Sequence, residues 1–490
     1  MVKEQEKPFI HLLRSPNLGY FFDVNRNEIV PVSDEAFEFL SQVMKDERPW
    51  EKDAPEEIRE LKENGYLSSH HVKEIEHPYT SYLNSIISRN MRQITLQLTQ
   101  NCNFRCKYCV YSQNIETQRK HTNKSMTFDI AKEAIDLIHD HSVDCDSIAV
   151  SFYGGEPLLE FDLLKKSVKY AKQKLRGKDV RFTITTNVSL LDDDIVEFFI
   201  KNNFNVLLSL DGPKEINDKN RVFASGKGTF DTVSQKLNNI QSKYPDFYDK
   251  IMFNMVVDPS NDFDRYNELY NKGIIKSLSQ FSYSIIDDTL SESPNIYSEE
   301  FVSKMEYQQF LGILSLLGKY PNERLPLITQ KWVSVLSDER EKFSPFNTLP
   351  DRASPSGPCI PGELRPMVTV DGNIISCERV NEMTDTMIVG KIGTGSKSDG
   401  INMVKVSSLL NVAKQTENQC KECWAFTHCG LCGRYSDHAG CFDGENRLKY
   451  CNERKLNFHE FLLREILLSE GISAWIGDEM DEPKSINLSL

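Results

Sequence analysis

The sequence predicts an α/β fold built around a parallel sheet, with a smaller unit on either side of it. From about residue 90 to 340, apolar strand patterns alternate with amphipathic helix patterns. Repeated β-α units of this length form parallel sheets, either open and doubly wound or closed into a barrel. Three cysteines follow the first of these strands, and eight more lie between residues 359 and 451. Cysteine clusters of this kind indicate bound metal.

The composition argues against several functional classes. The 490 residues carry 58 Lys and Arg against 72 Asp and Glu, a net charge of −14. No basic stripe offsets this deficit, so we expect no nucleic-acid partner. No apolar segment follows Met1 and no run reaches 18 apolar residues, so we expect no membrane span and a cytoplasmic protein. In a reducing compartment, twelve cysteines indicate metal before disulfides.

Residues 1–80 are expected to form a small domain of their own. Strand patterns at 9–13, 19–24 and 28–32 predict a hairpin, and capped helices should follow at 36–43 and 55–61, with a short wing strand at 66–67. This set is similar to the winged-helix domain with which peptide-modifying enzymes capture a leader peptide by strand addition. A cap that merely covers the sheet unit is the other interpretation.

The sheet unit, residues 90–340, begins with a strand at 94–98 that leads into Cys102, Cys106 and Cys109. Soft thiolates at this spacing suit zinc or iron–sulfur chemistry. The isolated Cys145 is interpreted as a small buried hydrophobe.

Polar and glycine residues follow the next strands of this unit, where the carboxyl ends of parallel strands gather functional groups. These residues are Gly154, Gly155, Glu156, Asn187, Ser209 and Asp211. A Gly-Gly pair after a strand is, taken alone, typical of a tight turn.

The second cysteine region follows a linker rich in Pro and Ser. A hairpin around Asp371 and Gly372 should bring Cys359 and Cys377 together. The remaining cysteines of this region are Cys420, Cys423, Cys429, Cys432, Cys441 and Cys451. On spacing alone, paired C-x-x-C motifs indicate a structural zinc site.

Together, the two cysteine arrays, Tyr108 before Cys109, and the Gly-Gly-Glu-Pro and Ser-Leu-Asp-Gly stretches resemble the radical SAM superfamily with a SPASM extension. The resemblance covers about residues 90–455 and implies a partial parallel β/α barrel. It implies that Cys102, Cys106 and Cys109 hold a [4Fe–4S] cluster whose fourth iron binds S-adenosylmethionine. The resemblance also implies cofactor contacts from Tyr108, Gly154, Gly155, Glu156, Asn187, Ser209, Asp211 and Arg221. For Arg221, a solvated surface position is the alternative.

The same resemblance implies two auxiliary [4Fe–4S] clusters in a SPASM domain at 355–455, and so three clusters in all. The nearer one is expected on Cys359, Cys377 and Cys432, and the farther one on Cys420, Cys423, Cys429 and Cys451. Two departures from the family pattern stand out: only two residues separate Cys429 from Cys432, and Cys441 is additional. Three alternatives follow: Cys441 completes the nearer cluster, Cys432 and Cys441 exchange roles there, or a free iron accepts a substrate thiolate.

The resemblance thus implies a radical peptide maturase that forms thioether cross-links in a ribosomal precursor peptide, with the leader held by the N-terminal domain. An external flavodoxin or ferredoxin would supply electrons. Alternatives are a formylglycine-forming anaerobic sulfatase-maturating enzyme, a carbon–carbon cross-linking or epimerising maturase, and, from another class, a zinc-ribbon binding protein. No side chain is assigned as a catalytic acid or base. Residues 456–490 should add a helix and an acidic tail.

Overall fold

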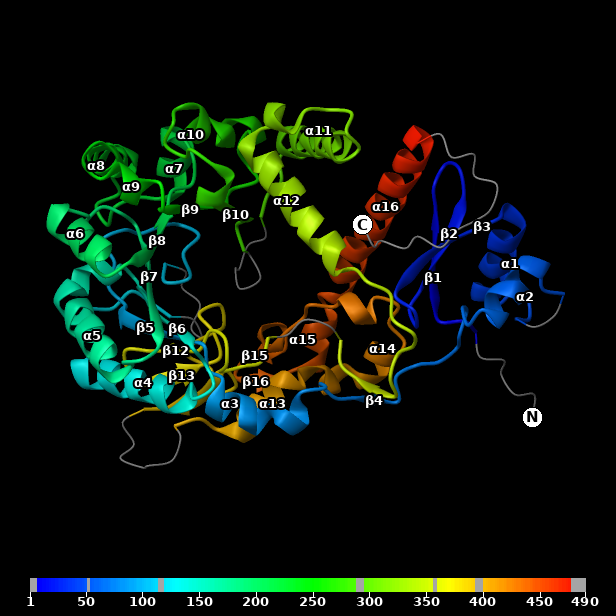
Figure 1. Cartoon of the computed structure of the whole chain (residues 1–490), viewed down its shortest axis with the longest axis horizontal. Helices are drawn as coiled ribbons and strands as arrows, with labels where there is room; N and C mark the ends of the chain where they lie inside the picture. Colours follow the sequence, from blue (N-terminus) through cyan, green and yellow to red (C-terminus); the bar gives the residue numbers. More distant parts are fainter. Residues whose placement is uncertain are drawn as a thin grey trace.

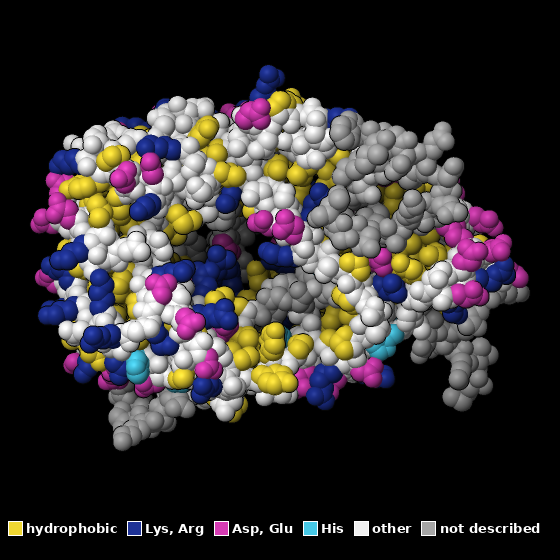
Figure 2. Space-filling view, in the orientation of Figure 1, with side chains coloured by type: hydrophobic (Ala, Val, Ile, Leu, Met, Phe, Trp, Pro, Cys, Tyr) yellow, Lys and Arg dark blue, Asp and Glu magenta, His cyan; other side chains and the backbone are white. Residues whose placement is uncertain are grey.

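The structure is a computed structural model that describes residues 7–50, 53–112, 119–287, 295–355, 359–392 and 400–476. Figure 1 shows the large sheet on the left and the N-terminal strands on the right, with the C-terminal cysteine-rich segments joining them along the lower side. A hollow opens in the middle of this face, and Lys and Arg side chains gather beside it (Figure 2). No helix within the described ranges has both the length and the apolar character to cross a membrane.

The core of the molecule is a parallel sheet whose strands follow one another in chain order, from β5 to β10. Apolar residues alternate or run continuously in these strands because helices cover the sheet, as expected for βαβ units. The strands are β5 (Gln93–Thr99), β6 (Ser147–Gly154), β7 (Asp179–Thr186), β8 (Phe204–Ser209), β9 (Met252–Val257) and β10 (Phe281–Ile285). The predicted α/β fold with a central parallel sheet is confirmed.

Helices follow the strands as the amphipathic patterns predict. Thr127 caps the first helix of the sheet unit by accepting a hydrogen bond from the Ile130 amide. The helices up to the second cysteine region are α3 (Leu83–Arg89), α4 (Phe128–His141), α5 (Phe161–Lys174), α6 (Asp193–Lys201), α7 (Lys214–Asn220), α8 (Phe230–Lys243), α9 (Pro245–Tyr248), α10 (Glu268–Asn271), α11 (Glu299–Leu316) and α12 (Leu327–Lys342).

The second cysteine region extends the same sheet. Strand β12 (Met367–Val368) pairs parallel with β5, and the antiparallel strands β13 (Asn373–Ile375) and β14 (Ile388–Lys391) complete a nine-stranded sheet within the described residues. The predicted hairpin around Gly372 is the β12–β13 turn, where Gly372 adopts φ +80°. Pairing with β12 covers the edge of β5, which would otherwise present unpaired backbone groups.

The N-terminal residues form a separate antiparallel sheet of β1 (Ile10–Arg14), β2 (Gly19–Asp23) and β3 (Glu28–Val32), followed by α1 (Asp34–Met44) and α2 (Glu56–Glu63). The expected wing strand at 66–67 is wrong. Leu67 instead adopts φ +60°, and its amide donates to the buried Asp23 carboxylate at 2.8 Å. The next strand, β4 (Glu74–Ile75), pairs with β11 (Arg352–Ala353).

This N-terminal sheet packs against the C-terminal part of the chain. Phe22 and Tyr20 share one hydrophobic cluster with Phe343, Phe458 and Leu462. Among the described residues, this cluster includes none from strands β5 to β10. The unit therefore does not cover the parallel sheet in the way that a simple cap would.

The remaining elements surround the second cysteine array and close the chain. They are α13 (Met403–Leu410), α14 (Glu417–Lys421), β15 (Asp437–His438), β16 (Cys441–Phe442), α15 (Gly444–Leu448) and α16 (Cys451–Ile476). The last helix is longer than the predicted 456–468, and it packs beside the N-terminal strands (Figure 1). The predicted acidic tail at 477–481 lies outside the described residues.

Candidate functional site

Three thiols leave the carboxyl end of β5 on one loop. Cys106 is buried, and Cys102 and Cys109 are half-buried. Burial, reinforced by the charges of Glu156 and the two neighbouring cysteines, raises the pKa of Cys102 to about 12. Burial likewise raises the pKa of Cys106 to about 11. Thiolates at these positions therefore need a cation to hold them deprotonated, which is what iron or another metal provides.

The donor set of this loop fits an iron–sulfur cluster. Three soft thiols from one loop match the three-cysteine ligation that leaves one iron open to a cofactor. Among the described residues, no three His, Cys, Asp or Glu side chains converge closely enough to hold a single ion. Ligands of a cluster bind separate irons and require no such convergence.

Gly154 and Gly155 lie directly against the cysteine loop. Gly154 adopts φ +135°, and a Cβ there would stand 2.3 Å from the Thr99 carbonyl oxygen. A Cβ on Gly155 would stand 2.1 Å from the Asn101 carbonyl oxygen and 3.2 Å from Cys102 Cβ. The Gly155 amide donates to the Thr99 carbonyl at 2.8 Å. The neighbouring backbone thus requires glycine at both positions, whether or not a ligand also approaches them.

Glu156 is almost fully enclosed, with 1% of its surface exposed. Its carboxylate accepts from the Thr186 hydroxyl and the Asn187 amide, both at 2.8 Å, and from the Leu158 amide at 3.1 Å. Burial raises its pKa and these hydrogen bonds lower it. The side chain therefore joins the ends of β6 and β7, and its contact with a cofactor ammonium stays a prediction.

Asn187 faces the first cysteine. Its Nδ2 lies 2.8 Å from Asn103 Oδ1 and 3.8 Å from Cys102 Sγ. Ser209 ends β8 on the same edge of the sheet and is half-buried. We predicted from the sequence that polar groups at these strand ends lie beside the cysteine loop, and Asn187 does so.

Tyr108, Asp211 and Arg221 form a buried hydrogen-bonded group. Arg221 donates to the Tyr108 hydroxyl at 2.8 Å, and that hydroxyl donates to Asp211 at 2.6 Å. Asp211 and Arg221 are 2% and 6% exposed, so Arg221 is not a solvated surface residue. Burial raises the pKa of Asp211 although Arg221 lowers it, and Arg221 also lowers the pKa of Cys106. Arg221 therefore places a positive charge beside the cysteine loop, and the Asp211 carboxylate partly offsets it.

A second buried network was not predicted from the sequence. Gln97 on β5 donates to Tyr111 at 2.9 Å and to Glu382 at 2.8 Å. Arg119, 2% exposed, lies 3.7 Å from Glu382 and donates to the backbone carbonyls of Glu378 and Val380. The network connects the Cys109 loop with the residue after Cys377. Two glutamines at the end of an otherwise apolar strand, Gln97 and Gln100, were the available signal.

Electrostatic influences connect some thiols of the second cysteine array. Burial is the largest cause of the raised pKa of Cys359 and of Cys377, and the charge of Cys432 adds to it in both. Burial is also the largest cause of the raised pKa of Cys420, Cys423 and Cys451, and the charge of Cys429 contributes in each case. The assignment of these cysteines to two cluster sites stays a prediction.

Cys441 is the additional cysteine of this region. It is exposed and begins β16, where it pairs with His438 of β15. The strongest influences on the Cys359 and Cys377 thiols come from burial and from neighbours other than Cys441. Two residues after Cys432, Arg434 donates to Asp287 at 2.5 Å, which ties this loop to the end of β10.

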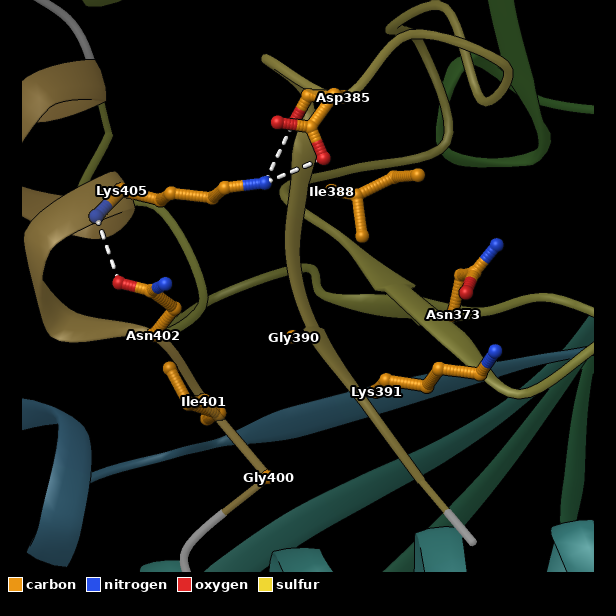
Figure 3. A pocket seen from close by; sticks show the side chains of 9 residues that line it. All are labelled: Asn373, Asp385, Ile388, Gly390, Lys391, Gly400, Ile401, Asn402 and Lys405. Atoms are coloured by element: carbon orange, nitrogen blue, oxygen red, sulfur yellow. Dashed lines mark hydrogen bonds and ion pairs between the residues drawn. The ribbon is translucent and has the colours of Figure 1, made fainter. Parts of the chain in front are cut away.

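A groove in the described part of the chain lies elsewhere. It has a volume of about 540 Å³ and lies along the edge strand β14, where Lys405 pairs with Asp385 at 2.7 Å (Figure 3). None of the sequence-predicted site residues lines it. The groove is therefore separate from the cysteine loops.

These features define a metalloenzyme with a parallel α/β sheet and a three-cysteine loop at the carboxyl edge of that sheet. The model of the radical SAM superfamily matches residues 96–272. An uncharacterized protein of Methanocaldococcus jannaschii is 31% identical over 233 residues, which are 47% of this chain and 73% of that protein. The chain belongs to the radical SAM superfamily. Its fold implies S-adenosylmethionine and a [4Fe–4S] cluster as cofactors.

Named relatives include enzymes that mature other proteins. The cysteine-type anaerobic sulfatase-maturating enzyme of Clostridium novyi is 22% identical over 76% of this chain and 95% of its own length. The radical SAM cyclopropyl synthase TigE of Paramaledivibacter caminithermalis is 26% identical over 49% of this chain and 51% of its own. A solved structure, native anSMEcpe with bound AdoMet and Cp18Cys peptide, has the same fold at 17% identity and a TM-score of 0.55, over 77% of this chain and 99% of that one.

Proposed function

We propose that this enzyme modifies a peptide by radical chemistry and joins a cysteine thiol to a carbon of that peptide as a thioether. The support for the proposal is the C-terminal array of eight cysteines, in which Cys432 influences the pKa of Cys359 and Cys377, Cys429 influences that of Cys420 and Cys451, and Cys441 is exposed at the start of β16. The relationship to sulfatase-maturating enzymes supports a peptide or protein substrate.

In this proposal, Cys102, Cys106 and Cys109 hold the cofactor-binding cluster. When bound, the cluster and S-adenosylmethionine supply a 5′-deoxyadenosyl radical that abstracts hydrogen. The protein orients the cofactor: Arg221 and Asp211, fixed by Tyr108, offer charge of both signs to its amino-acid end. Gly154 and Gly155 keep the β6 turn against the cysteine loop, which excludes water from that side.

The two further cysteine groups would hold two auxiliary clusters, for three in all. Cys420, Cys423, Cys429 and Cys451 give one of them four protein ligands. Cys359, Cys377 and Cys432 give the other only three, so its open position can take the thiolate of a substrate cysteine. A thioether replaces one C–H and one S–H bond by a C–S bond: one hydrogen atom would leave in 5′-deoxyadenosine, the thiol would lose its proton, and the remaining electron would pass to the iron–sulfur clusters, so that each cross-link removes two hydrogens from the peptide.

The N-terminal domain, residues 1–80, would hold the leader of the precursor peptide. Every residue of its edge strand β3 is buried, and Pro31 in this strand has no N–H to donate. The leader would therefore not be expected to add as a strand along β3. The radical SAM domain at 90–340, the SPASM domain at 355–455 and the C-terminal segment at 456–490 complete the proposed organisation, with a flavodoxin or ferredoxin as electron donor.

Formation of formylglycine on a sulfatase is the second candidate. It is favoured by the extent of the relationship, since the alignment spans 95% of the Clostridium novyi enzyme. The two functions differ in their products. Thioether formation removes two hydrogens and leaves one fewer alkylatable thiol, whereas conversion of a cysteine to formylglycine replaces its sulfur by a carbonyl oxygen.

The test is anaerobic turnover of the reconstituted enzyme with S-adenosylmethionine, a reductant and a library of synthetic cysteine-containing peptides. A substrate raises 5′-deoxyadenosine formation, and mass spectrometry before and after alkylation identifies the product. We expect a two-hydrogen loss with one thiol protected, and no such product from Cys432→Ala. A carbonyl product would establish the second candidate. Deoxyadenosine formation that no peptide alters would contradict a peptide substrate.

A further inference from the structure

A small recess is lined by residues from the carboxyl ends of β9 and β10 and from helices α11 and α12. Its volume is about 190 Å³. The lining residues are Val257, Phe263, Tyr283, Ile285, Phe301, Met305, Gln308, Gln309, Ile328, Thr329 and Trp332. Helices α11 and α12 come close because Gly312 has no side chain: a Cβ there would stand 3.0 Å from the Trp332 ring.

The recess has a buried apolar floor and a more open rim. Phe263, Phe301 and Ile328 on the floor are 6%, 0% and 2% exposed. Met305 and Trp332 are half-buried and so lie nearer the rim. The flexible side chain of Met305 can adjust its conformation to a bound group.

Two of the lining residues carry buried polar atoms without partners. Thr329 is 2% exposed, and among the described residues its hydroxyl makes no hydrogen bond. The Gln308 Oε1 atom is equally buried and unpaired, although its Nε2 donates to Asp264 at 3.4 Å. Burial alone raises the pKa of Tyr283, another polar lining residue, to about 12. Buried polar atoms are nearly always paired in native proteins, so these atoms call for a ligand or a water.

The size of the recess selects the ligand. A cavity of about 150 Å³ lined by apolar side chains holds one benzene ring, whereas sites for whole small molecules measure about 300–1,000 Å³. One aromatic side chain therefore fits. Because Gln308 Oε1 can only accept a hydrogen bond, that side chain must carry a donor.

We propose that the recess binds a single aromatic side chain with a hydroxyl or ring N–H, a tyrosine or tryptophan, of the peptide substrate. Gln308 accepts from its polar end, Thr329 pairs with the same group, and the phenylalanine floor holds the ring. This inference rests on the proposed peptide substrate.

The recess lies next to the cofactor side of the sheet edge. Val257 in its wall follows Val256, whose amide donates to Asp211 at 3.3 Å. An aromatic residue seated here would thus anchor the peptide one strand away from Tyr108, Asp211 and Arg221. It would act as a specificity contact and not as the reacting residue.

The experiment measures binding of p-cresol and toluene, which carry the side chains of tyrosine and phenylalanine, to the reconstituted full-length enzyme by calorimetry. We expect p-cresol to bind at least tenfold more tightly than toluene. Thr329→Val, which keeps the shape and removes the hydroxyl, should abolish this preference. Val335→Ala, on an exposed position of the same helix, is the matched control and should change neither affinity. Met305→Trp, which fills the rim, should remove binding of both probes.

Two outcomes would overturn the inference. One is an absence of p-cresol binding, which would mean that water fills the recess. The other is equal binding of both probes in the wild type and in Thr329→Val. Neither measurement depends on turnover. If p-cresol binds as expected but no peptide is modified, the proposed function is contradicted and the aromatic binding site is supported. If peptides are modified but p-cresol does not bind, the proposed function is supported and the aromatic binding site is contradicted.

Discussion

Because Gly155 has no Cβ, the turn after β6 can pack directly against the cysteine loop. Substitution by alanine would place a methyl group 2.1 Å from the Asn101 carbonyl oxygen, so the turn after β6 must move away from the cysteine loop. We expect Gly155→Ala to destabilise the protein by about 2–4 kcal/mol, a value typical of severe steric mutations, and to lower its iron content. Thermal unfolding and iron analysis measure both effects.

The control for this substitution is Gly430→Ala. Gly430 lies within the second cysteine array, but a Cβ there would meet nothing within 4 Å. Stability equal to that of the wild type is expected. An unchanged Gly155→Ala protein would mean that the close approach of the two loops is not needed.

Tyr108 connects a buried cation and a buried anion that do not bond directly. Arg221 and Asp211 are 3.8 Å apart, and the Tyr108 hydroxyl bonds to both. Tyr108→Phe would leave both charges short of a partner, which costs about 1–3 kcal/mol per buried polar group. We expect the iron content to stay constant and the affinity for S-adenosylmethionine to fall about tenfold, measured by equilibrium binding. The control is Tyr170→Phe. The Tyr170 hydroxyl donates to Asp136 on helix α4, outside the group of Tyr108, Asp211 and Arg221, so this variant should bind the cofactor normally.

At the scale of elements, the contact between β1 and α16 should respond to pH. His11 stacks on Trp424 with ring centroids 3.6 Å apart and lies 2.8 Å from His459. Burial, with smaller contributions from His459 and Lys455, lowers the pKa of His11 to about 4. The unfolded chain takes up this proton first, near pH 6.5. Stability from His11 is therefore complete above pH 6.5 and is lost as the pH falls from 6.5 to 4.

This prediction is tested by following the unfolding temperature across that pH interval. His11→Phe preserves the stacking on Trp424 and removes the proton, so the decline between pH 6.5 and 4 should be smaller than in the wild type. His139→Gln, at an exposed position, should decline as the wild type does. If His11→Phe left the pH dependence of the unfolding temperature unchanged, the His11 side chain would be protonated or solvated in the folded protein.

The long elements were predictable because local patterns specify them. Strands β5 to β8 carry apolar runs, and the helices that follow have capped amphipathic patterns. Strand β12 is only two residues long, and its pairing with β5 joins Met367 to Thr95. No local pattern contains that information. The strand expected at 66–67 failed because Leu67 takes a left-handed conformation that the Asp23 carboxylate stabilises.

The candidate site was predictable to a similar degree. Motif spacing located the cysteines and the strand-end residues, but it did not show that Glu156 and the two glycines first serve the protein's own backbone. Arg119 and Glu382 were missed because they come from different units, 263 positions apart (382 − 119) in the sequence. A buried ion pair between such distant residues becomes visible only once the sheet has brought them together.

At the scale of the whole molecule, three cysteine groups should account for all the iron. If each holds a four-iron cluster, the reconstituted protein binds about twelve irons. We expect about eight after alanine substitution of Cys102, Cys106 and Cys109, or of Cys359, Cys377 and Cys432, and an unchanged content in Cys441→Ala. Anaerobic iron, sulfide and zinc analysis measures this. Zinc in place of iron in the C-terminal groups would make them structural sites.

The nine-stranded sheet also sets the order in which the molecule can be completed during its synthesis. Strand β5 leaves the ribosome early, but its partner β12 is made only after residue 366, and the N-terminal sheet waits longer still for α16. Until then, both present apolar surface or bare strand edge to the cell. A nascent chain stalled before β12 is therefore a natural client for chaperones, and loading of the first cluster would best follow release of the finished chain.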